Sequence, residues 1–183
     1  MAGKRIWMRW IGPGLLILIL DRLIKQFHLW VVQPAFDMRN RLSEAPPYYQ
    51  LLLRLSDGLG KAFSFLQGDA GRVQSVRNTG MAFGLFEGNS IVILIGSALL
   101  LLACVFLLRG TRPAGLAPVS LSLILGGAAG NMIDRLLYGY VIDMFPFFGW
   151  FVFNAADVGV VAGAILCGWS LLFRPQDWSG KEQ

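Results

Sequence analysis

Four long apolar stretches divide the chain, and each is close to the length that a helix needs to cross a lipid bilayer. They cover residues 11–32, 90–108, 114–133 and 156–173. About 20 apolar residues span the hydrocarbon core, and because no water is available there, each span must satisfy its own backbone N–H and C=O groups. The pattern therefore predicts a mainly α membrane protein built as a bundle of four transmembrane helices.

The segment 33–89, between the first two spans, has a different pattern. Residues 33–60 contain prolines and an apolar run at 51–53, which favours a loop followed by a short surface helix. Residues 61–86 contain short apolar runs separated by glycines, which is typical of β-strands joined by turns. We therefore expect this extracytoplasmic insert to form a small β-sheet, or cradle, on the membrane surface.

The composition agrees with a membrane protein of one domain, residues 1–183. The chain is 55% hydrophobic and 15% charged, with a mean hydropathy of +0.57. Soluble domains are about 25% charged. The net charge is +5, but the basic residues mostly flank the apolar runs, so we expect no nucleic-acid partner. Membrane lipids are the expected surroundings.

Basic residues in the short segments predict the orientation of the spans. The first ten residues carry three positive charges, the loop 109–113 carries two, and the tail carries Arg174 and Lys181. Such short basic segments stay in the cytoplasm, whereas long loops contribute little to orientation. We therefore expect both termini to be cytoplasmic, with residues 33–89 and 134–155 outside. The start of the chain resembles a signal peptide, but no small-residue cleavage site follows it.

The sequence gives no sign of a metal or cofactor site. Cys104 and Cys167 lie inside apolar runs without CxxC spacing, so we interpret them as small buried hydrophobic residues. His28 is the one histidine and belongs to no ligand motif.

Charged residues within the first span call for an explanation. A charge at the bilayer centre costs about 2.5–3.5 kcal/mol on insertion scales, so such a residue indicates a function by default. Asp21 and Lys25 are four residues apart and share one helix face. They are either a neutralising pair that helps insertion or a polar patch that faces a substrate cavity.

The third span ends in a second polar group. Gly126 and Gly130 form a GxxxG step, which lets a neighbouring helix approach closely. Asn131, Asp134 and Arg135 then share one helical face. The acid and the arginine alone could be an interfacial anchor, but Asn131 lies one turn deeper and fits that interpretation less well.

Two further acids flank an aromatic link, residues 145–153, at the outer boundary. Asp143 lies in an apolar, strand-like stretch, and Asp157 lies at the start of the fourth span. Asp157 alone could be a helix N-cap. Two carboxylates in a poorly solvated site share one proton, so one could activate water while the other polarises a peptide carbonyl. Proton relays also use paired acids.

The polar motifs together resemble the lipoprotein signal peptidase family, also called signal peptidase II. Five blocks match in the family's order: Asp21 to Lys25 (DxxxK), Asn78 to Gly84 (NTGxAF), Gly126 to Arg135 (GGxxGNxxDR), Val141 to Phe145 and Phe153 to Asp157. The resemblance covers nearly the whole chain apart from residues 34–75. Each block alone is weakly specific, but the set is highly specific.

This resemblance implies an intramembrane aspartyl peptidase with Asp143 and Asp157 as its catalytic dyad. It implies that the substrate backbone is held by Asp21, Asn78, Asn131, Arg135 and Asn154. It implies that these groups are supported by Lys25, Gly80 and Asp134. The implied substrate is a bacterial prolipoprotein whose lipobox cysteine carries diacylglycerol, and cleavage falls just before that cysteine. The implied enzyme is a monomer of the inner membrane without a cofactor.

The sequence departs from the family pattern at two places, and two other functions would also use buried acids or lipid-modified partners. The segment before Asn78 is longer than usual, and Arg77 stands where the family often has an aromatic residue. A proton-coupled transporter would also use buried acids, but it would place them near mid-membrane and show an internal repeat. A non-catalytic scaffold for lipid-modified partners would tolerate Asn in place of Asp143 and Asp157.

Overall fold

The computed structural model describes residues 2–32, 51, 54, 76–80, 89–110, 114–148 and 150–178. This part of the chain is mainly helical. Its long helices are α1 (Ala2–Phe27), α5 (Ser90–Gly110), α6 (Ala117–Tyr138) and α7 (Ala155–Phe173). A π-helical segment, η1 (His28–Val32), continues α1, and a 3-10 turn, η5 (Pro175–Trp178), follows α7. The strands are β1 (Val76–Asn78), β2 (Val141–Asp143), β3 (Phe145–Phe147) and β4 (Phe151–Phe153).

The chain forms two compact units that interleave along the sequence. The first consists of Met1–Asp21, Thr79–Val141 and Ala155–Gln183. The second consists of Arg22–Asn78 and Ile142–Asn154. The prediction of one domain stays a prediction.

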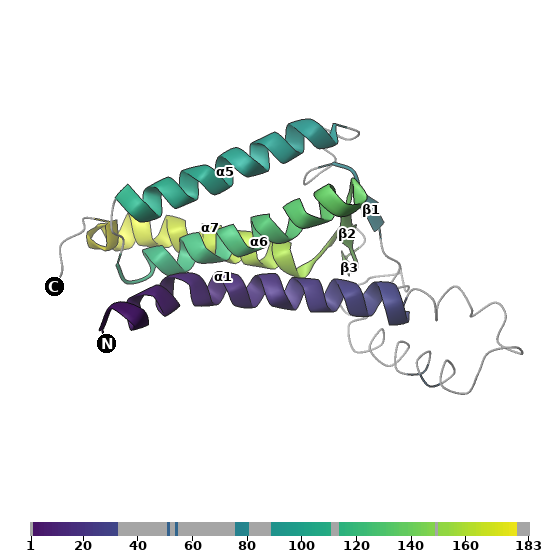
Figure 1. Cartoon of the computed structure of the whole chain (residues 1–183), viewed down its shortest axis with the longest axis horizontal. Coiled ribbons are helices and arrows are strands. Elements are labelled where there is room, and N and C mark those ends of the chain that lie inside the picture. The colour runs from purple at the N-terminus through teal and green to yellow at the C-terminus, as the bar shows by residue number, and fades with distance from the viewer. Residues whose placement is uncertain are drawn as a thin grey trace, which may run out of the picture. The chain divides into compact units, whose positions relative to one another are not determined.

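The first unit is a set of helices that alternate in direction. α6 packs against α7, and α5 packs against α6. Figure 1 shows that α1 and α6 begin at the end of the unit where α5 and α7 finish. Small residues allow close packing: a Cβ on Gly126 would meet the backbone of Gly14, and a Cβ on Gly127 would meet the backbone of Ala156. The helix approach predicted from the GxxxG step is therefore confirmed.

A polar contact joins α1 to α6 where the two helices are closest. Pro13 lies inside α1 and has no backbone N–H. The next backbone N–H, that of Gly14, donates to Ser122 Oγ at 2.8 Å. Ser122 is buried, so the bond satisfies a polar side chain within the helix interface.

The second unit contains the β3–β4 hairpin. These strands are antiparallel, with Phe145 opposite Phe153 and Phe147 opposite Phe151. The facing rings pack together, and Phe148 takes a positive φ of 47° where the chain reverses. The aromatic link therefore folds back on itself, so that Phe153 lies beside Phe145. β1 pairs with β2 in a second two-stranded sheet.

Several predictions differ from the structure or concern residues that it does not describe. Of the short helix expected near residues 51–53, the structure describes Leu51 and Arg54, which are both helical. Most of the strands expected between 61 and 86 lie outside the described residues, while β2, β3 and β4 come from a later segment. α6 extends to Tyr138, past the predicted end at 133. Within the described part, α7 is the one helix both long and apolar enough to cross a bilayer, and Ile91–Phe106 is apolar but shorter. The four-span bundle therefore stays a prediction.

Candidate active site

Asp143 is buried at the end of β2 and receives a hydrogen bond on each carboxylate oxygen. Asn78 Nδ2 donates to Oδ2 at 2.8 Å, and Asn154 Nδ2 donates to Oδ1 at 2.6 Å. The side chain of Asp143 is 2% exposed and that of Asn154 is 0% exposed. Hydrogen bonds to a carboxylate are stronger than those between neutral groups. The orientation of this carboxyl group is therefore fixed from two sides.

The strands explain why these three residues meet. Asn78 ends β1 and Asp143 ends β2, and the two strands pair. The β3–β4 hairpin then returns the chain, so that the Met144 N–H donates to the Phe153 carbonyl at 3.1 Å. Asn154 follows directly and reaches back to Asp143. Residues from three sequence blocks are thus assembled in the second unit.

Asp157 lies in the first turn of α7, in the first unit. Its Oδ1 accepts a hydrogen bond of 2.7 Å from Asn131 Nδ2 on α6. α7 begins at Ala155, so Asp157 is inside the helix. The N-cap interpretation of Asp157 is therefore wrong, because the helix starts two residues earlier. Asp143 and Asp157 are described in different units, and their pairing stays a prediction.

Arg135 and Asp134 follow Asn131 on α6. Arg135 Nη2 donates to the Gly80 carbonyl at 2.9 Å, which ties the segment after β1 to α6. Asp134 is 0% exposed, which does not fit an interfacial anchor directed to solvent. Lys25, four residues after Asp21 on α1, is also buried.

Asp21 contacts the start of α7. Its side chain is 0% exposed, and Oδ1 accepts a hydrogen bond of 3.0 Å from the Ala156 backbone N–H. This N–H belongs to the first turn of α7, where backbone donors have no partner within the helix. A Cβ on Gly130 would lie 2.9 Å from Asp21 Oδ2, so the glycine makes room for the carboxylate. Asp21 thus orders the turn that carries Asp157.

The structure also bears on metal binding, on the two cysteines and on one further buried acid. In the part of the chain that the structure describes, no group of three His, Cys, Asp or Glu side chains is arranged to hold a metal ion. Cys104 and Cys167 are free thiols, and Cys104 is buried. Asp177 follows α7, is 3% exposed and belongs to none of the motif blocks found in the sequence. The signal that could have found it is an acid four residues after an apolar span and next to Trp178.

Residues 14–173 of this chain match the sequence model of the family described as signal peptidase (SPase) II.

Individual relatives agree with that match. A lipoprotein signal peptidase of Syntrophomonas wolfei is 35% identical over 159 residues, covering 87% of this chain and 89% of the relative. One from Rhodopseudomonas palustris is 31% identical over 158 residues, covering 82% and 83%. One from Moorella thermoacetica is 43% identical over 110 residues, covering 58% and 71%.

Two solved structures of bacterial membrane enzymes, both determined by the in meso method, are similar to this chain. The one at 2.3 Å resolution has a TM-score of 0.65 and 24% identity, covering 95% of this chain and 93% of its own. The one at 1.9 Å resolution has a TM-score of 0.50 and 32% identity, covering 56% and 69%. The likeness to the first extends over nearly the whole chain and concerns the fold.

Proposed function

Because the chain belongs to the signal peptidase II family, and is thus a membrane protease that removes signal peptides from prolipoproteins, we propose that it acts as an aspartyl peptidase with Asp143 and Asp157 as its catalytic pair. One carboxylate takes a proton from water, which attacks the scissile carbonyl, while the other carboxyl group donates a proton to the carbonyl oxygen. As the tetrahedral intermediate collapses, the first acid donates the proton it took from water to the departing nitrogen, and a hydroxyl of the intermediate returns its proton to the second acid. The signal peptide leaves with a new carboxyl terminus and the rest of the substrate with a new amino terminus. The shared proton belongs to the pair.

The observation that supports this proposal most strongly is the hydrogen bonding of each acid. Asp143 accepts from Asn78 and Asn154, and Asp157 accepts from Asn131. Acids held in a fixed orientation are what general acid–base catalysis needs, since the proton must move over hydrogen-bond distance. Asn154, which donates to Asp143, and Asp157 also belong to the same motif block, Phe153 to Asp157.

We further propose that cleavage falls just before a cysteine that already carries diacylglycerol. The family resemblance supports this position. A substrate with a membrane-spanning signal peptide and a lipid must be cut at the bilayer surface. Asp143 lies at the end of β2 and Asp157 in the first turn of α7. Both acids therefore lie at the end of an element, as a site at the bilayer surface requires. Asn131 and Arg135 would hold the substrate backbone.

We propose that the protein is a monomer that crosses the membrane four times, with cytoplasmic termini and an extracytoplasmic active site. Two observations support it. In Figure 1, α1 starts at the end of the first unit where α7 finishes, which fits termini on one side. The basic residues of the short segments predict that this side is cytoplasmic.

The test is a gel-shift cleavage assay in detergent with a diacylglyceryl-modified prolipoprotein. The variants are Asp143→Asn and Asp157→Asn, and the matched control is Glu182→Gln, which neutralises an acid outside the motif blocks. We expect cleavage by the wild type and the control and none by either dyad variant, with folding retained. Cleavage by either dyad variant at the wild-type rate would refute the dyad. A wild type that fails on several modified substrates would favour the scaffold or transporter.

A further inference from the structure

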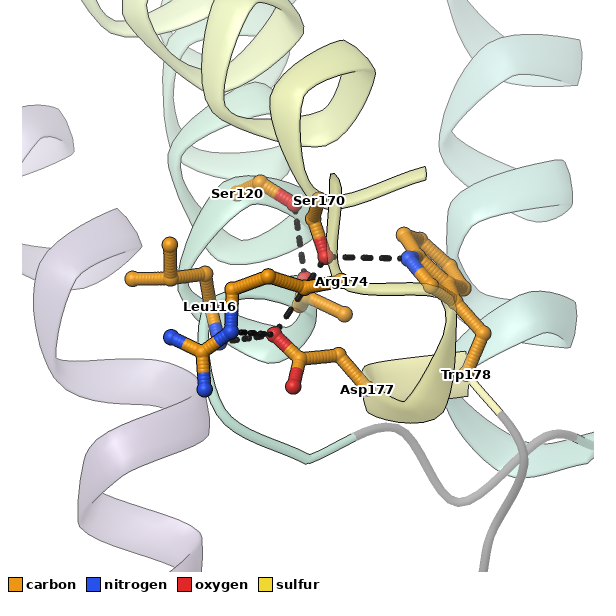
Figure 2. Close-up of polar contacts among 7 residues, drawn as sticks. Leu116, Ser120, Ser170, Arg174, Asp177 and Trp178 are labelled. Carbon is orange, nitrogen blue, oxygen red and sulfur yellow. Dashed lines mark hydrogen bonds and ion pairs between the residues drawn. The ribbon is translucent and has the colours of Figure 1, made fainter. Parts of the chain in front are cut away.

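A buried acid organises the end of the first unit where α6 begins. Figure 2 shows Asp177, from η5, among residues of α6, α7 and the turn before α6. Asp177 Oδ2 accepts a hydrogen bond from the Leu116 backbone N–H at 2.9 Å and another from Ser170 Oγ at 3.4 Å. Arg174 Nε lies 3.5 Å from the same oxygen, and the Arg174 side chain is 44% exposed.

The backbone around Asp177 is fitted to this arrangement. The Ala114 N–H donates to the Asp177 carbonyl at 2.7 Å. Gly115 has a φ of +58°, and a Cβ there would lie 2.5 Å from Asp177 Oδ1. Trp178 Nε1 donates to Ser170 Oγ at 3.0 Å. We call residues 114–116, Ser170 and Pro175–Trp178 the clasp.

The clasp supplies what the start of α6 lacks. Leu116 is the N-cap residue and has no side-chain capping bond, and the first turn of α6 contains no acid. A carboxylate near a helix N-terminus interacts favourably with the helix dipole. Asp177 does this from beyond α7, so the same side chain that caps α6 also ties the end of α7 to it.

Axial register between α6 and α7 needs such a tie. Within a bilayer, helices are not held together by the hydrophobic effect, and small residues let them pack closely. Gly127 and Gly163 provide such close packing. Polar contacts then fix the register at both ends: Asn131 with Asp157 at one end and the clasp at the other. Leu116 and Asn131 are about 22 Å apart along α6.

We propose that Asp177 is a positioning residue that holds α7 in register with α6 and so keeps Asp157 against Asn131. The proposal rests on the proposed function, in which Asp157 changes its protonation during each turnover. The Asn131 contact therefore weakens and re-forms as the enzyme works. The clasp involves none of the reacting groups, so it maintains the register throughout the cycle.

The kinetic test compares Asp177→Ala with two controls. Asp177→Asn keeps an oxygen for the Leu116 N–H, and Arg174→Gln removes the half-exposed ion pair alone. We expect Asp177→Ala to lower kcat about tenfold with KM changed less than about twofold, because a misplaced acid slows chemistry more than binding. Both controls should keep kcat within about twofold of the wild-type value. Asp177→Asn retains an acceptor for the Leu116 N–H, and an exposed ion pair such as that of Arg174 contributes little. Wild-type kcat for a folded Asp177→Ala would overturn the proposal.

A double-mutant cycle tests the register itself without substrate. Distant, independent sites affect the unfolding constant additively to within roughly a factor of two. If both contacts hold one register, Asn131→Ala and Asp177→Ala should deviate from additivity by more than about fivefold in the unfolding constant, measured in detergent. Additive effects would overturn the proposal. If Asp177→Ala does not fold, Ser170→Ala replaces it in the cycle, with the same two interpretations.

The two proposals fail in different ways. If the wild type cleaves no modified prolipoprotein, the proposed function falls, while the unfolding cycle still measures the coupling. If Asp157→Asn abolishes cleavage but Asp177→Ala leaves kcat unchanged, the dyad stands and the clasp has only a local structural role.

Discussion

At the scale of single residues, asparagine side chains are the immediate neighbours of both acids that we assign to catalysis. Asn78 and Asn154 donate to Asp143, and Asn131 donates to Asp157. An amide donates a hydrogen bond without adding a charge, so it orients a carboxylate while leaving it able to exchange a proton. A lysine or arginine in the same place would favour the ionised form of the acid.

Asn154→Ala tests this arrangement. It removes the donor that lies 2.6 Å from Asp143 Oδ1. We expect kcat to fall about a hundredfold, by analogy with the loss of one well-placed donor in other hydrolases, with a smaller change in KM. The measurement is steady-state cleavage of a lipid-modified prolipoprotein. Gln26→Ala, which removes an exposed amide from α1, is the control. A kcat within twofold of the wild type would show that Asn154 does not orient the acid.

Two roles are open to Asp21. The family resemblance implies that it contacts the substrate, whereas in the structure its carboxylate accepts a hydrogen bond from the Ala156 N–H. Losing a helix cap costs about 1 kcal/mol. We therefore expect Asp21→Ala to lower the free energy of unfolding by about that amount and to reduce kcat, whereas Asp21→Asn should retain the cap. Denaturation in detergent and Michaelis kinetics would be measured together. A raised KM with unchanged stability would instead indicate direct substrate contact.

At the scale of helices and strands, glycines determine how closely the helices of the first unit pack. Gly163 on α7 faces α6, where a Cβ would lie 2.7 Å from the Ser120 carbonyl oxygen and 2.8 Å from Ile124 Cγ1. Gly168, on the same helix, has open space around the equivalent position. The two glycines therefore differ in packing while sharing a helix.

This pair gives a matched test of helix packing. Gly163→Ala should destabilise the protein by about 1–3 kcal/mol, because a tightly packed interface accommodates an added methyl poorly. Gly168→Ala should be neutral or slightly stabilising, since alanine favours helix. Unfolding in detergent would be followed by circular dichroism. Equal stabilities for the two variants would mean that α6 and α7 pack less closely than described.

At the scale of the whole molecule, the orientation in the membrane is the main prediction. Exposed apolar side chains recur along α7, including Val161, Ile165 and Leu172, which suits contact with lipid. The β3–β4 hairpin carries Trp150, which is 87% exposed. Its segment lies on the extracytoplasmic side in the proposed topology, whereas the tail after η5 lies in the cytoplasm.

Cysteine labelling in intact cells tests this topology. In a background with Cys104 and Cys167 replaced by serine, Trp150→Cys should react with a membrane-impermeant maleimide added from outside. Glu182→Cys should react only after the membrane is permeabilised, because the positive-inside rule keeps the tail in the cytoplasm. The reverse labelling pattern would contradict the proposed orientation.

Local sequence patterns were enough to predict the protein class, its family and the residues to test. Apolar length and composition are local properties, and helices form at all four apolar stretches, although α6 extends past the predicted end. The order of the five motif blocks gave the family, which the comparison over residues 14–173 establishes. A GxxxG step likewise predicted close packing correctly, because a glycine leaves space whatever its neighbour is.

Which polar groups contact one another depends on the fold, because the partners are far apart in the chain. Asn78 reaches Asp143 across 65 residues, Asp21 reaches Ala156 across 135, and Asp177 reaches Leu116 across 61. No local pattern specifies such partners, because a carboxylate accepts equally well from a substrate, a side chain or a helix end. Packing of the helices and pairing of the strands bring particular donors within reach. For this reason the cap formed by Asp21 and the clasp formed by Asp177 could not be predicted from the sequence.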